Sequence, residues 1–344
     1  MSAHEPGPGH ATGAARGRRR LRHALRPHLV ALPLVALGLG VWWALPPRAP
    51  VATTPAAGMG PTAAADLPDL QSFTTRDGAR LGVRVYPADA DTIAVLLHGS
   101  GMDGRALHAL ARDLAGHGAA TAVVPDLRGH GPAPHRRGDV DHVGQLEEDI
   151  ADLIDYLTAA PTVSGRRPRI VVIGHSLGGG LALRFGGGPY GHLADAIVLL
   201  APFLGHDAPP TRPGGGGWAA PHVGRIAALT VLNAFGIHRF DGAPVIAFAL
   251  TESQRADGGT PTYSHRLQVS FAPRDYRHDL AALDHPLLVV AGRDDASFDA
   301  ERYAATVLPW AGADVVLLDG IDHVGVVTRP SALAAVRSWM VDRP

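Results

Sequence analysis

One serine in this sequence lies where its hydroxyl could act as a nucleophile. Ser176 is the centre of the run Gly-His-Ser-Leu-Gly at positions 174–178, and the apolar stretch Ile170–Ile173 precedes the run directly. A helical pattern begins at Leu177. Gly-x-Ser-x-Gly between a strand and a helix predicts a sharp turn that lifts the serine above a sheet, with glycines where a Cβ atom would clash. The alternative is a glycine-rich turn whose serine only caps the helix.

A serine hydroxyl is a weak nucleophile, so it needs a general base and a carboxylate that orients the base. Two strand-like stretches later in the chain end in such groups. The stretch Leu287–Ala291 is followed by Asp294 and Asp295, and the stretch Asp314–Leu318 is followed by His323. Because the carboxyl ends of parallel strands meet at one edge of a sheet, we expect these groups to lie near the serine. We interpret His323 as the general base, with an ordinary loop histidine as the alternative.

The elements that must position these groups alternate along the chain. Apolar, strand-like stretches, typical of buried parallel strands, recur at Leu81–Tyr86, Ile93–Leu97, Thr121–Pro125, Ile170–Ile173, Ala196–Leu200, Leu287–Ala291 and Asp314–Leu318. Helical patterns lie between or after them, at Ala106–Ala115, Val143–Ala159, Leu177–Phe185, Asp299–Val307 and Ser331–Met340. This alternation predicts an α/β fold with a doubly wound, mostly parallel sheet and helices on both faces.

One segment breaks the alternation. From Pro202 to about Ala282 the sequence has a glycine-rich loop and then helix-capable stretches such as Val223–Phe235. An insertion of this length between two core strands predicts a helical cap over the site, at about residues 203–282 and after the sixth core strand. The stretch Val223–Phe235 is apolar enough to line an acyl pocket or to touch a membrane, although as a bare pattern it also fits a core helix.

The order serine, aspartate, histidine on successive strand ends makes residues from about 80 to 344 resemble the α/β-hydrolase superfamily. In that family the acid usually takes the fourth position of Gly-x-x-Asp, which here is Asp295, with Asp294 as the second choice. The loop His-Gly-Ser-Gly at 98–101 resembles the turn whose backbone amide completes an oxyanion hole. The resemblance therefore implies a catalytic set with two backbone oxyanion donors: Ser176, Asp295 and His323, with the amides of Ser100 and Leu177.

Finer features resemble the group of lysophospholipases, monoacylglycerol lipases and S33 serine aminopeptidases. These features are the compact loop at 98–101, the segment Asp-Leu-Arg-Gly-His-Gly at 126–131 and the cap. The resemblance implies a serine hydrolase that cleaves small-molecule or lipid carboxylic esters through an acyl-enzyme. An S33-type aminopeptidase is one alternative, and a non-catalytic, ligand-binding member of the fold is an alternative of another class. By the same resemblance, His98, His130 and His175 brace the turn at Ser176 and the neighbouring loops. Asp126 is interpreted as a salt-bridging or turn-capping residue rather than the catalytic acid.

Composition and motifs exclude several other functions. The chain has 31 basic and 32 acidic side chains, a balance that argues against a nucleic-acid partner. It has no cysteine, which excludes disulfides, thiol nucleophiles and cysteine-ligated metals. The 19 histidines include no His-x-x-x-His beside a glutamate, and there is neither a Walker loop nor a Gly-x-Gly-x-x-Gly after a first strand. We therefore predict neither a metal nor a cofactor.

The start of the chain differs from the rest. We predict four parts: a disordered basic tail at 1–28, a transmembrane signal anchor at 29–45, a Pro/Ala-rich linker at 46–69 and the hydrolase domain with its cap at 70–344. No ionised side chain lies between Arg26 and Arg48, enough residues to approach the ~30 Å of a bilayer core. The arginines before the run predict that the tail stays in the cytoplasm and the domain lies outside, held at the membrane. The alternatives are a cleaved signal peptide that releases a secreted domain, and a buried helix of that domain.

Overall fold

The structure is a computed structural model that describes residues 47–50, 66–159 and 165–343, together with Met1. The chain divides into two units, Met1–Pro46 and Pro47–Pro344, and every helix and strand described below belongs to the second. The predicted signal anchor at 29–45 lies outside the described residues, as do most of the predicted tail and linker. In the part of the chain that the structure describes, no helix is both long and apolar enough to cross a bilayer.

An eight-stranded sheet runs through the second unit in the order β1-β2-β4-β3-β5-β6-β10-β11. Its strands are β1 (Gln71–Thr74), β2 (Arg80–Tyr86), β3 (Thr92–Leu97), β4 (Thr121–Pro125), β5 (Arg169–His175), β6 (Ala196–Leu200), β10 (Leu287–Gly292) and β11 (Ala313–Leu318). The pairs β1–β2 and β2–β4 are antiparallel, and all the other pairs are parallel. The predicted doubly wound, mostly parallel sheet is therefore confirmed.

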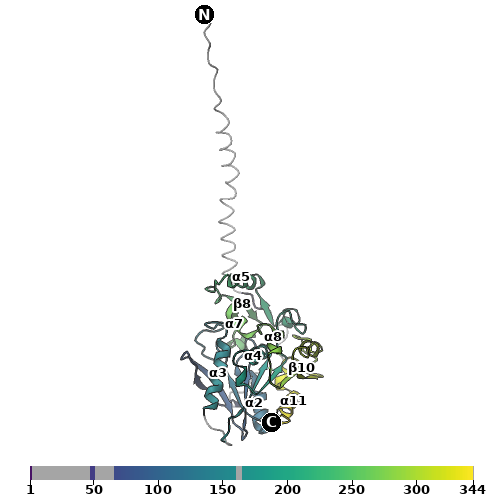
Figure 1. The fold of residues 1–344 in the computed structure, drawn as a ribbon. Helices are drawn as coiled ribbons and strands as arrows, with labels where there is room; N and C mark the ends of the chain where they lie inside the picture. The colour runs from purple at the N-terminus through teal and green to yellow at the C-terminus, as the bar shows by residue number, and fades with distance from the viewer. Residues whose placement is uncertain (2–46, 51–65, 160–164, 344) are drawn as a thin grey trace. The chain divides into compact units, whose positions relative to one another are not determined.

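The path of the chain through the sheet puts helices on both faces. From β3 the chain passes through α2 to β4 on one side, and from β5 it passes through α4 to β6 on the other. Because such crossovers are right-handed, opposite directions place α2 and α4 on opposite faces. In Figure 1, α3 lies beside α4, and α11 lies near α2. The α-helices outside the segment between β6 and β10 are α2 (His108–Gly116), α3 (Gln145–Thr158), α4 (Leu177–Gly186), α9 (Arg302–Val307), α10 (Gly325–Thr328) and α11 (Pro330–Val341).

The reversal of direction falls between the neighbouring strands β3 and β5. The loops that follow two such strands diverge, which leaves a crevice at their carboxyl ends where sites collect in folds of this kind. Every residue of β6 and β10 is buried, as is typical of parallel strands covered on both faces, whereas β11 at the edge is only half-buried. The strands β3 and β5 that border the crevice are likewise buried at their carboxyl ends.

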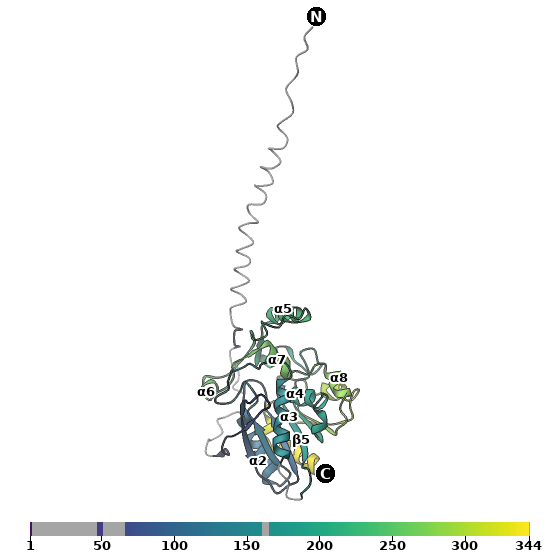
Figure 2. The ribbon, with the colours of Figure 1, turned by 60° about the vertical axis from the view of Figure 1, so that its left-hand side comes forward.

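The chain between β6 and β10, which we call the insertion, has its own small sheet. Its three antiparallel strands lie in the order β7-β8-β9, and four α-helices and the 3-10 helix η4 (Pro213–Gly217) accompany them. These elements are β7 (Ala219–Pro221), α5 (Val223–Ala234), β8 (Pro244–Phe248), α6 (Glu252–Ala256), β9 (Thr262–Ser264), α7 (His265–Phe271) and α8 (Tyr276–Ala281). The sequence predicted a glycine-rich loop and helices here but no strands, because strands of three to five residues carry too little pattern to recognise. Figures 1 and 2 both show α5 at the end of this unit opposite α2.

Candidate active site

Ser176 lies at a sharp turn between β5 and α4. Its backbone has φ 56° and ψ −119°, and residues other than glycine rarely adopt such a positive φ. Two hydrogen bonds hold the turn: the Ser176 amide donates to the Leu200 carbonyl at 2.9 Å, and the Phe203 amide donates to the Ser176 carbonyl at 2.9 Å. The end of β6 therefore fixes a strained turn that presents the serine hydroxyl at the edge of the sheet.

The glycines around Ser176 are required by close backbone contacts. A Cβ atom on Gly174 would lie 2.1 Å from the Gly178 carbonyl oxygen, and one on Gly178 would lie 2.3 Å from the Leu97 carbonyl oxygen. A Cβ atom on Gly99, in the loop after β3, would lie 3.1 Å from the Ser176 Cβ atom. The predicted reason for the Gly-x-Ser-x-Gly spacing, removal of clashing Cβ atoms, therefore holds in the structure.

Three predicted residues come together at the carboxyl edge of the sheet. The His323 Nε2 atom lies 3.0 Å from the Ser176 hydroxyl oxygen, and the His323 Nδ1 atom lies 2.7 Å from Asp295 Oδ2. The Asp295 side chain is 1% exposed and that of His323 is 23% exposed, so the imidazole remains reachable by a small molecule. Asp294, the second choice for the acid, is exposed and makes no hydrogen bond to His323.

The surroundings of Asp295 keep it ionised. Burial raises the pKa of the Asp295 carboxyl, but the hydrogen bond and charge of His323, with two backbone amides, lower that pKa below its usual value overall. The two amides belong to Ser297 and Phe298 and donate to Oδ1 at 2.7 and 3.1 Å. An ionised carboxylate accepts the Nδ1 proton of His323, which leaves Nε2 free to accept the proton of the serine hydroxyl.

A second histidine forms a hydrogen bond with the backbone of His323. His175 Nε2 lies 2.9 Å from the His323 carbonyl oxygen and so donates to it. Burial, and next the nearby charge of His323, lower the pKa of His175 to about 3, so this imidazole is neutral near neutral pH. This contact fits the bracing role that the resemblance implied for His175.

The two residues whose amides the resemblance implies as oxyanion donors lie at the same crevice. Ser100 follows β3, Leu177 opens α4, and both residues line the cavity that contains Ser176. Neither amide donates a hydrogen bond to any residue that the structure describes. Free amides beside a nucleophile can stabilise an oxyanion, and the positive end of the α4 dipole adds to this effect.

Two residues of the insertion hold the loop that contains Ser100. Trp218 Nε1 donates to the Ser100 hydroxyl at 2.8 Å, and the Gly101 amide donates to the Tyr263 hydroxyl at 2.7 Å. The sequence gives no signal for either residue, since both lie more than a hundred positions downstream in a segment without regular pattern.

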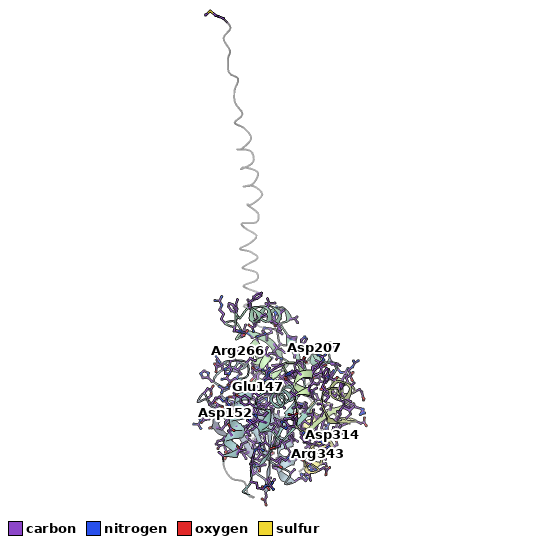
Figure 3. The ribbon with its side chains drawn as sticks, in the orientation of Figure 1. Glu147, Asp152, Asp207, Arg266, Asp314 and Arg343 are labelled. Atoms are coloured by element: carbon purple, nitrogen blue, oxygen red, sulfur yellow. The ribbon has the colours of Figure 1, made fainter. Side chains whose placement is uncertain are left out.

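A cavity of about 730 Å³ extends from Ser176 and His323 toward the insertion. Much of its wall is apolar: Leu204, Val223, Ile226, Ile246, Phe248 and Phe298. Its charged lining consists of three arginines and two aspartates: Asp207, Arg212, Arg274, Asp275 and Arg277. Figure 3 labels Asp207 in the upper part of this unit, above Asp314 of β11. Within the described ranges, no group of three or more histidine, aspartate or glutamate residues could hold a metal ion.

The apolar helix α5 has two surfaces. Val223 and Ile226 near its start line the cavity, so this part of the predicted apolar stretch does face the site. Val231 and Phe235 toward its end are 57% and 79% exposed. The stretch is therefore not a core helix, which is the alternative that its bare pattern left open.

Solved structures of ester-cleaving enzymes share the fold. A monoacylglycerol lipase from Paleococcus ferrophilus matches with a TM-score of 0.59 and 18% identity, over 77% of this chain and 100% of that chain. A thermophilic esterase from Thermogutta terrifontis matches with a TM-score of 0.55 and 20% identity, over 80% of this chain and 98% of that chain. At these identities the likeness extends to the fold alone.

Comparisons by sequence give the family. An uncharacterized protein of Mycobacterium tuberculosis (strain ATCC 25618 / H37Rv) is 31% identical over 134 residues, which are 39% of this chain and 35% of that protein. The chain thus covers about a third of the curated relative that it matches. A model of the alpha/beta hydrolase family matches residues 94–336, which include all the strands from β4 onward and every residue of the candidate site. The chain belongs to the alpha/beta hydrolase family.

Proposed function

We propose that this chain is a serine hydrolase that cleaves carboxylic esters through an acyl-enzyme. The observation that carries the proposal is the continuous hydrogen-bonded chain from Asp295 through His323 to the Ser176 hydroxyl, with distances of 2.7 and 3.0 Å. Membership of the alpha/beta hydrolase family supports hydrolytic chemistry. Structural neighbours that are esterases and monoacylglycerol lipases support an ester as the substrate.

The proposed mechanism assigns one role to each group. His323 Nε2 takes the proton of Ser176 as the hydroxyl oxygen bonds to the ester carbonyl carbon, and Asp295 stabilises the imidazolium. The amides of Ser100 and Leu177 hold the carbonyl oxygen as it becomes negative. His323 then gives its proton to the leaving alkoxide. Water attacks the acyl-enzyme, with His323 as base again, and the acid leaves as the proton returns to Ser176.

The cavity favours an apolar acyl group. Its wall is largely apolar, and about 730 Å³ is room for a medium or long acyl chain. This supports a substrate of the lysophospholipase or monoacylglycerol lipase kind. An S33-type aminopeptidase would need carboxylates to hold a substrate amine, and the lining has Asp207 and Asp275 but a greater number of arginines. A panel of p-nitrophenyl esters from acetate to palmitate, beside aminoacyl anilides, distinguishes these substrates.

The alternative of another class is a ligand-binding member of the family without catalysis. A fluorophosphonate probe separates the two. We expect it to label the wild type at Ser176, to label the His323→Ala variant much more slowly, and to leave Ser176→Ala unlabelled while its circular dichroism spectrum stays unchanged. An unlabelled, folded wild type that hydrolyses neither esters nor anilides would remove the hydrolase proposal.

We also propose that residues 29–45 hold the domain at the outer face of a membrane. The support is the apolar run between Arg26 and Arg48, with the arginines that precede it. An intact N-terminus in the membrane fraction, with the domain open to protease added from outside, is the expected result. A soluble, secreted chain whose N-terminus lies beyond residue 45 would instead indicate a cleaved signal peptide.

A further inference from the structure

The loop after β3 is held from outside the core sheet. Three hydrogen bonds join the insertion to Ser100 and Gly101. The insertion donates in two of them and accepts in the third. Trp218 Nε1 donates to the Ser100 hydroxyl at 2.8 Å, the Thr260 amide donates to the Gly101 carbonyl at 2.8 Å, and the Gly101 amide donates to the Tyr263 hydroxyl at 2.7 Å. The insertion therefore fixes both residues that the Ser100–Gly101 peptide bond joins.

Tyr263 is itself fixed. Its side chain is fully buried, and its hydroxyl lies 2.6 Å from His130 Nε2. His130 Nδ1 lies 3.2 and 3.1 Å from the Leu127 and Arg128 carbonyl oxygens, which can only accept, so the proton of the neutral imidazole is on Nδ1. His130 Nε2 is therefore an acceptor, and the Tyr263 hydroxyl donates to it while it accepts the Gly101 amide. Burial raises the pKa of Tyr263 far above its usual range and, with His98 nearby, lowers that of His130 to about 3, so both groups are neutral near neutral pH.

The glycines at 99 and 101 give this loop a wide choice of backbone conformations. Ser100 lies between Gly99 and Gly101, and Gly101 has φ +74°, a conformation that glycine adopts without strain. Gly99 packs so close to Ser176 that a Cβ atom on it would be 3.1 Å from the serine Cβ atom. A small rotation of this loop would therefore turn the Ser100 amide away from the oxygen that it stabilises, and the loop sequence alone does little to prevent that rotation.

We propose that Tyr263 and Trp218 are positioning residues, which hold the Ser100 amide in the direction that an oxyanion needs. This inference rests on the proposed hydrolase function. The two side chains act through the loop after β3, so they affect the transition state, in which the carbonyl oxygen is negative, more than the binding of the neutral ester. The insertion then has a role beyond forming the cavity wall, since it completes the geometry of the oxyanion hole.

Tyr263→Phe tests the inference, and Tyr86→Phe is its matched control. Tyr86 is also a buried tyrosine whose hydroxyl bonds a histidine, His108 Nδ1 at 2.9 Å, and neither Tyr86 nor His108 lines the cavity. With p-nitrophenyl butyrate we expect Tyr263→Phe to lower kcat at least about tenfold with little change in KM. A trifluoromethyl ketone, which forms an oxyanion on the serine, should lose affinity by the factor by which kcat/KM falls. Tyr86→Phe should leave kcat, KM and Ki near the wild-type values.

Each result decides the matter. Wild-type kcat and Ki in Tyr263→Phe, or an equal loss in Tyr86→Phe, overturn the inference, because Tyr263 would then contribute only to packing. If Tyr263→Phe does not fold, Ser100→Ala removes the Trp218 contact while leaving both amides, and the same fall in kcat and inhibitor affinity is required. A wild type that neither hydrolyses an ester nor reacts with a fluorophosphonate overturns the proposed function and this inference together. A reactive wild type with unchanged variants overturns the inference alone.

Discussion

At the scale of single residues, two adjacent aspartates have opposite environments. Asp295 is buried and bonded to His323, whereas Asp294 is exposed. We expect Asp295→Asn to lower kcat by about 10⁴, because an amide at this position can donate to Nδ1 and so favour the wrong imidazole tautomer. The measurement is kcat for a p-nitrophenyl ester.

Asp294→Asn serves as the matched control for this prediction. The substitution is the same and lies one position away, and we expect kcat to stay within about twofold of the wild type, as for most exposed sites. Equal losses in the two variants would contradict the assignment of the acid. From sequence alone these two residues were separable only by resemblance, because both follow the same strand. Their difference in burial depends on the turn between 292 and 295, which is a tertiary feature.

At the scale of secondary structure, the turn between β5 and α4 depends on the absence of a side chain at Gly174. A methyl group there would lie 2.1 Å from the Gly178 carbonyl oxygen, and backbone cannot move aside cheaply. We expect Gly174→Ala to lower the free energy of unfolding by roughly 3 kcal/mol or more, as severe overpacking does. It should also abolish fluorophosphonate labelling of Ser176. Urea denaturation measures the first effect.

Gly116, the last residue of α2, provides the control because nothing lies within 4 Å of where its Cβ atom would be. We expect Gly116→Ala to be neutral or slightly stabilising, since alanine has the higher helix propensity. If the two alanine variants are equally stable, the turn between β5 and α4 is less constrained than its contacts indicate.

The core elements and the small ones differ in how well the sequence predicts them. Strands such as Thr121–Pro125 and Ala196–Leu200 have the predicted boundaries, because a strand buried on both faces must be continuously apolar. The strands β1 and β7–β9 were not predicted. They have three to five residues, and β7 is only half-buried or exposed, so pairing partners rather than side-chain pattern determine them. Trp218 and Tyr263 could not be linked to Ser100 for the same reason.

At the scale of the whole molecule, a buried ion cluster joins the core to the insertion. Glu147 of α3 accepts from Arg184 of α4 and from Arg274 of the insertion, both at 2.7 Å, and Arg184 also donates to the Val269 and Ala272 carbonyls. Figure 3 labels Glu147 near the middle of the unit. We expect Glu147→Gln to lower the free energy of unfolding by about 3 kcal/mol, because it leaves the buried Arg184 guanidinium without its anion.

A more exposed ion pair is the comparison for this cluster. Asp299 and Arg302 form a pair at 2.9 Å, with side chains that are 29% and 61% exposed. Asp299→Asn should cost less than about 1 kcal/mol, since water screens such a pair. Urea denaturation of both variants gives the two values. A Glu147→Gln variant as stable as Asp299→Asn would mean that the cluster contributes little to holding the insertion on the core.

Buried histidines make the stability of the whole domain depend on pH. His130 and His175 are 4% and 5% exposed, and burial with a neighbouring histidine lowers the pKa of each to about 3. In the unfolded chain the usual pKa is about 6.5. Between these pH values the unfolded state binds a proton at each position and the folded state does not. The free energy of unfolding should therefore fall as the pH is lowered through this window. Its slope against pH should correspond to the uptake of up to two protons on unfolding, one at each of these residues.

The substitution His130→Asn measures the contribution of one of these two histidines to the pH dependence. Around pH 5 the wild-type slope of unfolding free energy against pH should exceed that of His130→Asn by about one proton, whatever the loss of stability common to all pH values. The slope comes from urea denaturation at several pH values between 7 and 4.5. His135→Asn, at an exposed position, should keep the wild-type slope. The slope depends on the number of protons taken up on unfolding and does not depend on lost contacts. A His130→Asn slope equal to that of the wild type would therefore mean that His130 is already protonated in the folded state. In that case Tyr263 could not donate to its Nε2 atom, and the hydrogen bonds would run in another direction.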